Sequence, residues 1–153
     1  MIQRIQTLYL FVSLLLTGTL FFLPIADFIL GKESYSLYFD GIKAHKPGST
    51  ITEVTTYPLI ILLSIIALLN FISIFLYKKR IAQMRICIYN ILLMIGLVIL
   101  IIFYIFKIAG DIEATINYKI TAILPLISII LTYLASRAIR KDEKLIRSLD
   151  RIR

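Results

Sequence analysis

Residues 59–85 read LIILLSIIALLNFISIFLYKKRIAQMR, an apolar run that is followed at once by a cluster of basic residues. As an α-helix, residues 59–77 cover about 28 Å, which approaches the roughly 30 Å hydrocarbon core of a bilayer. The run holds no Asp, Glu, Lys or Arg, and it lacks the alternation of polar with apolar residues that is typical of a transmembrane β-strand. It therefore predicts a membrane-spanning helix that ends in a basic loop.

Three further runs of the same kind, also free of charged residues, lie at 5–23, 86–106 and 120–135. With the first they predict an all-α membrane protein, a four-transmembrane-helix bundle that forms a single domain over residues 1–153. The expected spans are about 5–25, 58–77, 86–107 and 119–137, with an outer loop at 26–57 and a tail at 138–153. We expect the first run to remain as a helix, because its apolar stretch exceeds the ~7–15 residues of a signal-peptide core.

The distribution of charge predicts the orientation of these helices. The chain carries 17 Lys and Arg against 9 Asp and Glu, a net charge of +8. Arg4, the 78–85 loop and the tail are basic, whereas the segments at 27–53 and 107–119 are close to neutral. Because short basic segments are retained in the cytoplasm, both termini and the 78–85 loop are expected on the cytoplasmic side.

The outer loop is the one extramembrane segment with strand character. Residues 34–39 alternate polar with apolar side chains, and the turn signal Asp40-Gly41 follows them. Residues 49–57 are rich in Thr, Ile and Val, which favours a second strand. We therefore expect a small extracytoplasmic β-hairpin, or a three-stranded patch, between the first two helices.

Two prolines mark expected features of the spans. Thr55 or Thr56 is expected to cap the second span, with Pro58 in its first turn, where the missing N–H costs nothing. Pro125 is expected to kink the fourth span near its outer end, because it frees the backbone carbonyl of Thr121.

Few polar side chains interrupt the four apolar runs, and none of them is an acid or a base. Proton-coupled carriers, voltage sensors and ion pumps ordinarily place an ionisable group at depth, so this composition argues against all three classes. Asn70 and Asn90 lie near the inner ends of adjacent spans. We expect them to hydrogen-bond across the helical hairpin and to act as intramembrane polar packing.

No catalytic or metal-binding motif is recognisable in the sequence. Asp40, His45 and Glu53 in the outer loop can ligate metals, but their spacing matches no metal motif. The single cysteine, Cys87, excludes an internal disulfide, and no acid–base pair or activated nucleophile is clustered along the chain. We therefore expect no catalytic residues, no metal and no cofactor, and we interpret the protein as not an enzyme.

The tail has a helical pattern, in which basic residues from 137 onward recur along one stripe and Leu145, Leu149 and Ile152 along another. The fourth span is therefore expected to continue as an amphipathic, basic C-terminal helix. This stripe leaves two interpretations open, anchorage to anionic lipid headgroups and docking on a membrane protein. Direct nucleic-acid binding is not expected, because aromatic residues do not interleave with the basic ones. The candidate partner- or lipid-binding residues of the cytoplasmic face are Gln3, Arg4, Gln6, Lys78, Lys79, Arg80, Arg85, Arg137, Arg140, Lys141, Lys144, Arg147 and Arg151.

Three segments of the chain resemble one known family. They are MIQRIQTLYL at residues 1–10, KRIAQMRIC at 79–87 with Asn90 following, and SRAIRKDEKLIRSLDRIR at 136–153. They resemble an uncharacterised family of four-span inner-membrane proteins from Bacteroidota, and the resemblance covers essentially the whole chain. It implies a multi-pass protein of a bacterial cytoplasmic membrane. It implies no activity, because the family is known only as a domain of unknown function.

Our leading hypothesis is a non-catalytic integral inner-membrane accessory or structural subunit. Such a subunit binds a larger membrane protein complex and uses its basic cytoplasmic face as the docking surface. The alternative is a small self-associating channel or carrier for a small solute, to which the Ser, Thr and Asn residues of the spans point. A membrane enzyme that acts on lipid or isoprenoid has the least support, because no reactive constellation is recognisable.

Overall fold

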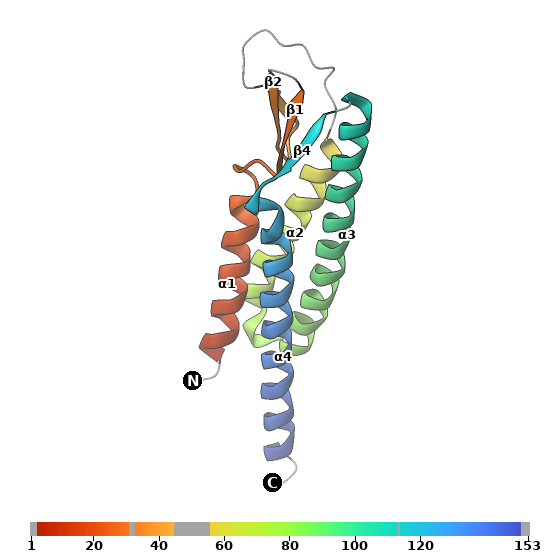
Figure 1. Ribbon diagram of the computed structural model, residues 1–153. Helices are drawn as coiled ribbons and strands as arrows, with labels where there is room; N and C mark the ends of the chain where they lie inside the picture. Colours follow the sequence, from red (N-terminus) through yellow and green to blue (C-terminus); the bar gives the residue numbers. More distant parts are fainter. Residues whose placement is uncertain (1–2, 31–32, 45–55, 113, 151–153) are drawn as a thin grey trace.

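The computed structural model describes residues 3–30, 33–44, 56–112 and 114–150, and it is mostly helical (Figure 1). Four helices lie side by side: α1 (Gln3–Thr19), α2 (Tyr57–Phe75), α3 (Arg80–Ile112) and α4 (Leu124–Asp150). Helix α2, helix α3 and the helical segment Ile120–Leu145 are each long and apolar enough to cross a membrane, and α1 is a shorter apolar helix. The predicted helical class is thus confirmed, and three helices of the described chain could span a membrane, as a membrane protein requires.

Helix α1 is shorter than the span expected at 5–25. It ends at Thr19, and a turn follows in which Phe21 N–H donates to the Gly18 carbonyl at 3.3 Å. Pro24 comes next, and a proline disfavours the helical conformation of the residue before it. The chain therefore leaves the helix about one and a half turns earlier than the apolar pattern indicates.

The connection between α2 and α3 is tighter than the loop expected at 78–85. A single turn of 3-10 helix, η1 (Leu76–Lys78), leads through Lys79 directly into α3, which begins at Arg80. Ala, Gln, Met and Arg fill the first turns of α3, and all four are strong helix formers. Of the basic residues of this region, Arg80 and Arg85 therefore project from α3.

The strands form one antiparallel sheet at the opposite end of the bundle, in the order β3-β2-β1-β4. One predicted strand lies largely outside the described residues, and one strand of the sheet was not predicted. Residues 49–55 of the expected partner strand lie outside the described residues, and Tyr57 already begins α2. In addition, the fourth strand comes from the segment between α3 and α4, where a loop was expected; its β-branched and aromatic residues suit an edge strand. The strands are β1 (Ala26–Leu30), β2 (Glu33–Leu37), β3 (Ile42–Ala44) and β4 (Thr115–Tyr118).

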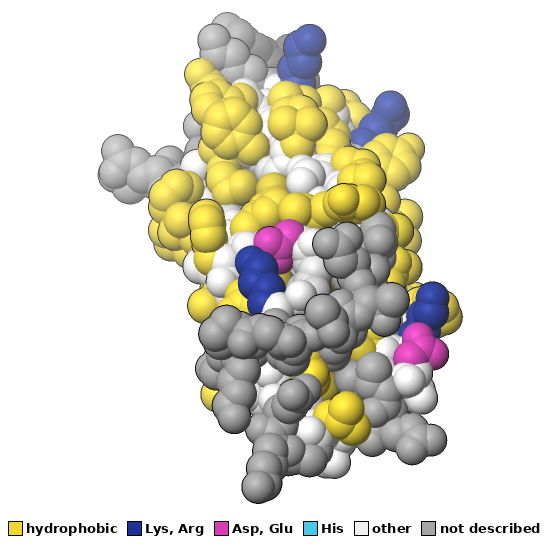
Figure 2. All heavy atoms as spheres, turned by 90° about the horizontal axis from the view of Figure 1, so that it is seen from above, with side chains coloured by type: hydrophobic (Ala, Val, Ile, Leu, Met, Phe, Trp, Pro, Cys, Tyr) yellow, Lys and Arg dark blue, Asp and Glu magenta, His cyan; other side chains and the backbone are white. Residues whose placement is uncertain are grey.

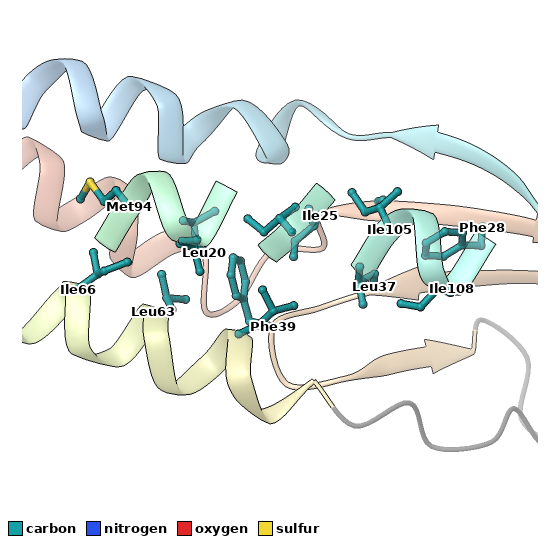
Figure 3. Close-up of a cluster of buried hydrophobic side chains, with 14 of the residues drawn as sticks. Leu20, Ile25, Phe28, Leu37, Phe39, Leu63, Ile66, Met94, Ile105 and Ile108 are labelled. Carbon is teal, nitrogen blue, oxygen red and sulfur yellow. The ribbon is translucent and has the colours of Figure 1, made fainter. Parts of the chain in front are cut away.

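The sheet packs on the outer halves of α2 and α3 through its apolar face (Figure 3). Tyr35, Leu37 and Phe39, which were expected on one face, are all buried. They meet side chains such as Leu63 of α2 and Ile108 of α3. Burying an aromatic or aliphatic side chain of this size stabilises a fold by about 1.5–3 kcal/mol. The sheet is therefore an integral part of the bundle core.

A hydrogen bond joins the start of α2 to the segment that follows β2. Thr56 is the N-cap residue of α2, but its Oγ1 donates to the Phe39 carbonyl at 3.1 Å and makes no capping bond.

Pro125 is the second residue of α4, after the 3-10 turn η2 (Ile120–Ile123), so no carbonyl of an earlier helical turn is freed. Because α4 begins at Leu124, the proline lies in its first turn and does not interrupt the α-helix in the way that was expected.

Viewed from the end that carries the sheet, apolar side chains occupy most of the described surface (Figure 2). The few acidic groups visible there each lie beside a basic one (Figure 2). Around the helices, large apolar residues such as Phe22, Ile99 and Ile130 are well exposed on the protein surface. A bundle that is apolar outside as well as inside is typical of helices surrounded by lipid.

Candidate functional site

The two ends of the bundle differ in chemistry. Helix α1 begins, α2 turns into α3, and α4 ends at one end, opposite the sheet (Figure 1); we call this the basic end and the other the sheet end. At the sheet end two ion pairs lie within the protein: Lys119 Nζ lies 3.0 Å from Asp27 Oδ2, and Lys43 Nζ lies 2.9 Å from Asp40 Oδ2. At the basic end, most of the described Lys and Arg side chains are exposed.

The described structure places the candidate residues of the cytoplasmic face in several different settings. Gln3 and Arg4 open α1, Lys78 ends η1, and Arg147 lies in α4, whereas Arg151 is outside the described residues. Arg80, at the first position of α3, is half-buried. The side chains exposed at the surface are those of Lys79, Arg85, Arg137, Arg140, Lys141 and Lys144.

Gln6 is not part of the exposed surface, although it was expected there. Its side chain is only 6% exposed, and its Nε2 donates a hydrogen bond to Oδ2 of Asp142, which is also 6% exposed. This bond joins the first turns of α1 to the last part of α4. Oδ1 of Asp142 has no hydrogen-bond partner among the described residues.

The burial of Asp142 was not predicted from the sequence, in which this acid stands among the basic residues of the tail. A signal for it is nevertheless present in the helical spacing. Thr132, Ala135, Ile139 and Asp142 follow one another at intervals of three or four residues, and all four are buried. The buried stripe of α4 thus continues without interruption from the apolar span into the charged tail.

Two grooves flank α4 at the basic end. The α3–α4 groove is lined by Lys79, Arg80, Ile81, Ala82, Arg85, Ile86 and Glu143. The α1–α4 groove is lined by Ile5, Tyr9, Tyr133, Leu134, Ser136, Arg137, Ala138, Arg140, Lys141, Asp142 and Lys144. The single basic face that the sequence suggests is therefore divided by α4 into two surfaces with different neighbours.

A chain of buried polar side chains crosses the interior of the bundle. Asn90 Nδ2 of α3 donates to Asn70 Oδ1 of α2 at 2.7 Å, so the expected pair lies at hydrogen-bond distance. Asn70 Nδ2 in turn donates to Ser13 Oγ of α1 at 3.4 Å, and Ser13 Oγ lies 3.1 Å from Thr132 Oγ1 of α4. All four helices are thus linked through neutral groups. Hydrogen bonds between helices in lipid each contribute about 0.6–2 kcal/mol.

A second set of polar contacts stabilises the connection between α2 and α3. Gln83 Nε2 donates to the Ser73 carbonyl at 2.9 Å, and Ser73 Oγ lies 3.3 Å from the buried Sγ of Cys87. These contacts hold the start of α3 against the end of α2. They fix the positions from which Lys79, Arg80 and Arg85 project.

The described residues contain no group of three His, Cys, Asp or Glu side chains that is arranged to hold a metal ion. Of the metal-capable residues in the outer loop, Asp40 pairs with Lys43, and His45 and Glu53 lie outside the described residues. The functional candidates are therefore the two grooves of the basic end and the polar chain inside the bundle.

Comparison with known proteins places the chain in a family. No protein of curated function matches the sequence. The model of the family described as "Domain of unknown function (DUF4293)" matches residues 2–152, which include all of the three segments that carry the resemblance except Met1 and Arg153. Because that match extends over almost the entire chain, the protein belongs to the DUF4293 family.

Proposed function

We propose that the protein is a non-catalytic integral subunit or accessory factor of a larger membrane protein complex. In this proposal it crosses a bacterial cytoplasmic membrane four times, and α1 is a span in addition to the three longer helices. The basic end faces the cytoplasm, because short segments rich in Lys and Arg are retained there. The partner docks at the basic end.

The observation that carries this proposal is the composition of the α3–α4 groove. Lys79 and Arg85 are exposed on one of its walls, and the opposite wall carries Glu143 of α4. A surface that mixes both signs of charge favours a protein partner, because an acidic wall disfavours a lipid phosphate. Complementary charges at such a rim mainly select the partner and speed its association.

The chemistry of the partner follows from the same residues. The Arg85 guanidinium forms two parallel hydrogen bonds with a carboxylate, so we expect Asp or Glu on the partner at the level of the headgroups. Ile81 and Ile86 supply an apolar contact between the charges. We therefore expect the partner to present an acidic segment that directly adjoins one of its own spans.

Crosslinking in native membranes tests the proposal. A photoreactive amino acid at Ile81, which is 43% exposed in this groove, should capture one partner in stoichiometric yield. The triple variant Lys79→Gln/Arg80→Gln/Arg85→Gln should lose that partner. A matched variant, Arg137→Gln/Arg140→Gln/Lys144→Gln, removes the same number of charges from the other groove and should keep it. Recovery of the wild-type protein only as a free monomer in mild detergent would overturn the proposal.

Membrane insertion must be measured in the same variants, because the same charges also orient the helices. A cysteine introduced as Gly110→Cys in a Cys87→Ser background should react with an impermeant maleimide from the outer side in every variant. If the maleimide labelled the first triple variant from the opposite side, the variant would have lost its partner because its topology is inverted.

The second candidate function is a self-associating channel or carrier, and the polar chain through the bundle favours it. Asn90 Oδ1 and Ser128 Oγ are buried there without a described hydrogen-bond partner, as expected for groups that bind a transient small solute. Purified protein in liposomes should then pass a small polar solute, and Asn70→Leu should abolish the flux. Absence of flux for a panel of ions and neutral solutes would eliminate this function.

A further inference from the structure

The α1–α4 groove has a graded composition along α4. Tyr133, Arg137, Lys141 and Lys144 recur at intervals of four, four and three residues, so they share one face of the helix. The distance along the axis from Tyr133 to Lys144 is about 16 Å. Tyr133 lies in the apolar run at 120–135, whereas the three basic residues lie beyond the end of that run. One end of the groove is therefore apolar and aromatic, and the other end is cationic.

Helix α1 supplies the facing wall of this groove through Ile5 and Tyr9. Its position beside α4 is held by the hydrogen bond between Gln6 and Asp142. The groove has a volume of about 710 Å³, which accommodates a lipid headgroup and the first part of its chains. Tyrosine rings are suited to this level of the membrane, because they combine an apolar body with a polar tip.

The groove contains one acid, Asp142, but its side chain is buried, so the exposed charges of the groove are cationic. Asp142 lines the groove, but only 6% of it is exposed, and its Oδ2 accepts the hydrogen bond from Gln6. Four basic side chains, those of Arg137, Arg140, Lys141 and Lys144, are exposed around it. Electrostatics therefore favour an anion here, in contrast to the α3–α4 groove with its half-buried Glu143.

We propose that the α1–α4 groove is a binding site for one anionic phospholipid of the inner leaflet. Arg137 and Arg140 hold the phosphate through paired N–H donors, and Lys141 and Lys144 contribute charge from the next turn. The glycerol backbone lies at Tyr133, and the acyl chains continue over the apolar outer face of the spans. The inference concerns the groove on the other side of α4, and it shares with the proposed function only the orientation that places the basic end at the cytoplasmic side.

Native mass spectrometry of the full-length protein tests this site directly. Phosphatidylglycerol and phosphatidylcholine with identical chains are the probes, and one bound phosphatidylglycerol should persist under conditions that remove phosphatidylcholine. Arg137→Gln/Arg140→Gln should weaken phosphatidylglycerol binding by tenfold or more, because two surface cations are lost. The matched variant Lys79→Gln/Arg80→Gln should bind phosphatidylglycerol as the wild type does.

A fluorescence measurement supplies a second readout that does not depend on the stability of an adduct. The sequence contains no Trp, so Tyr133→Trp introduces a single reporter in the groove. Brominated phosphatidylglycerol should quench it more strongly than brominated phosphatidylcholine at equal content in nanodiscs. Arg137→Lys/Arg140→Lys, which keeps the charge but loses the planar fork, should retain most of this preference.

Four outcomes would overturn the inference. Equal binding of the two lipids would remove the selectivity for an anion. Equal losses in both Gln variants would show general attraction of anionic lipid to the basic end. Complete competition by free glycerol phosphate would show a site for the headgroup alone. A protein segment crosslinked at Tyr133 in place of lipid would assign the groove to a partner.

Discussion

The hydrogen bond between Gln6 and Asp142 yields the sharpest prediction of stability. Gln6→Leu removes the described donor to a buried carboxylate whose second oxygen has no described partner. A hydrogen bond to a charged group contributes about 1.5–3 kcal/mol, so the free energy of unfolding should fall by about 2–3 kcal/mol. Asp142→Leu leaves only a neutral amide without its partner and should cost about 1–2 kcal/mol.

The double variant distinguishes this contact from two independent effects. In Gln6→Leu/Asp142→Leu, both polar groups are replaced by apolar side chains of similar size, so no buried group lacks a partner. Such replacements are often close to neutral, and the double variant should lose less than about 1 kcal/mol. The two single changes should therefore show a coupling energy of at least about 2 kcal/mol.

Equilibrium unfolding of the purified protein in mixed micelles, followed by far-ultraviolet circular dichroism, measures these differences. Leu145→Gln, an exposed position on the same part of α4, serves as a control and should change stability by less than about 0.5 kcal/mol. Strictly additive losses in the double variant would refute the reasoning. They would mean that the two side chains do not share a buried contact in the membrane protein.

Three further predictions concern the interior and the sheet. Asn70→Leu should destabilise the bundle by about 1–2 kcal/mol and Asn90→Leu by about 1 kcal/mol or less. The difference is expected because Asn70 forms hydrogen bonds to two other helices and Asn90 to one, and the same unfolding assay compares the two variants. Thr56→Val removes the donor to the Phe39 carbonyl and should cost about 1 kcal/mol, while Thr56→Ser should restore most of the stability. Leu37→Ala empties a fully buried position under the sheet and should cost about 2–5 kcal/mol, with faster proteolysis of the sheet end; unchanged proteolysis would contradict this packing.

The helices were predictable because their signal is local. An uncharged apolar run of about 20 residues is sufficient to indicate a span, whatever the rest of the chain does. The ends of the helices were less predictable, because charge was taken as a mark of a loop. Residues 80–85 are basic yet helical, since helix propensity and the contact of Gln83 with α2 outweigh the cost of their charges.

The sheet shows the opposite case, in which the decisive contacts are distant in sequence. The β1–β2 hairpin joins neighbouring segments, and β2 overlaps the predicted strand at 34–39. Strand β4 pairs with β1 across about 90 residues of chain, and Lys119 beside it reaches Asp27. Four residues without a strong alternating pattern give no local sign of such pairing. Only the fold that brings α1 and α4 together creates it.

At the candidate site, composition identified the basic end but not its division into two grooves. That division depends on the rotational phase of α4. Successive helical residues are about 100° apart, so the neighbouring acids Asp142 and Glu143 face different helices. The first is buried towards α1, and the second borders the groove at the start of α3.

The same phase argument explains how one short charged segment serves two surfaces. Because the Asp142 side chain is buried, the exposed charged residues of the α1–α4 groove are all cationic, while Glu143 adds an acid to the α3–α4 groove. A single residue inserted after Ile139 would rotate everything beyond it by about 100° and break the bond to Gln6. Asp142 would then take the position of Glu143, and Glu143 that of Lys144 in the α1–α4 groove, while an uncharged insertion would keep the net charge at +8. The selectivity of the basic end thus depends on the register of α4 against α1, which the buried Gln6–Asp142 pair sets together with the contact between Ser13 and Thr132.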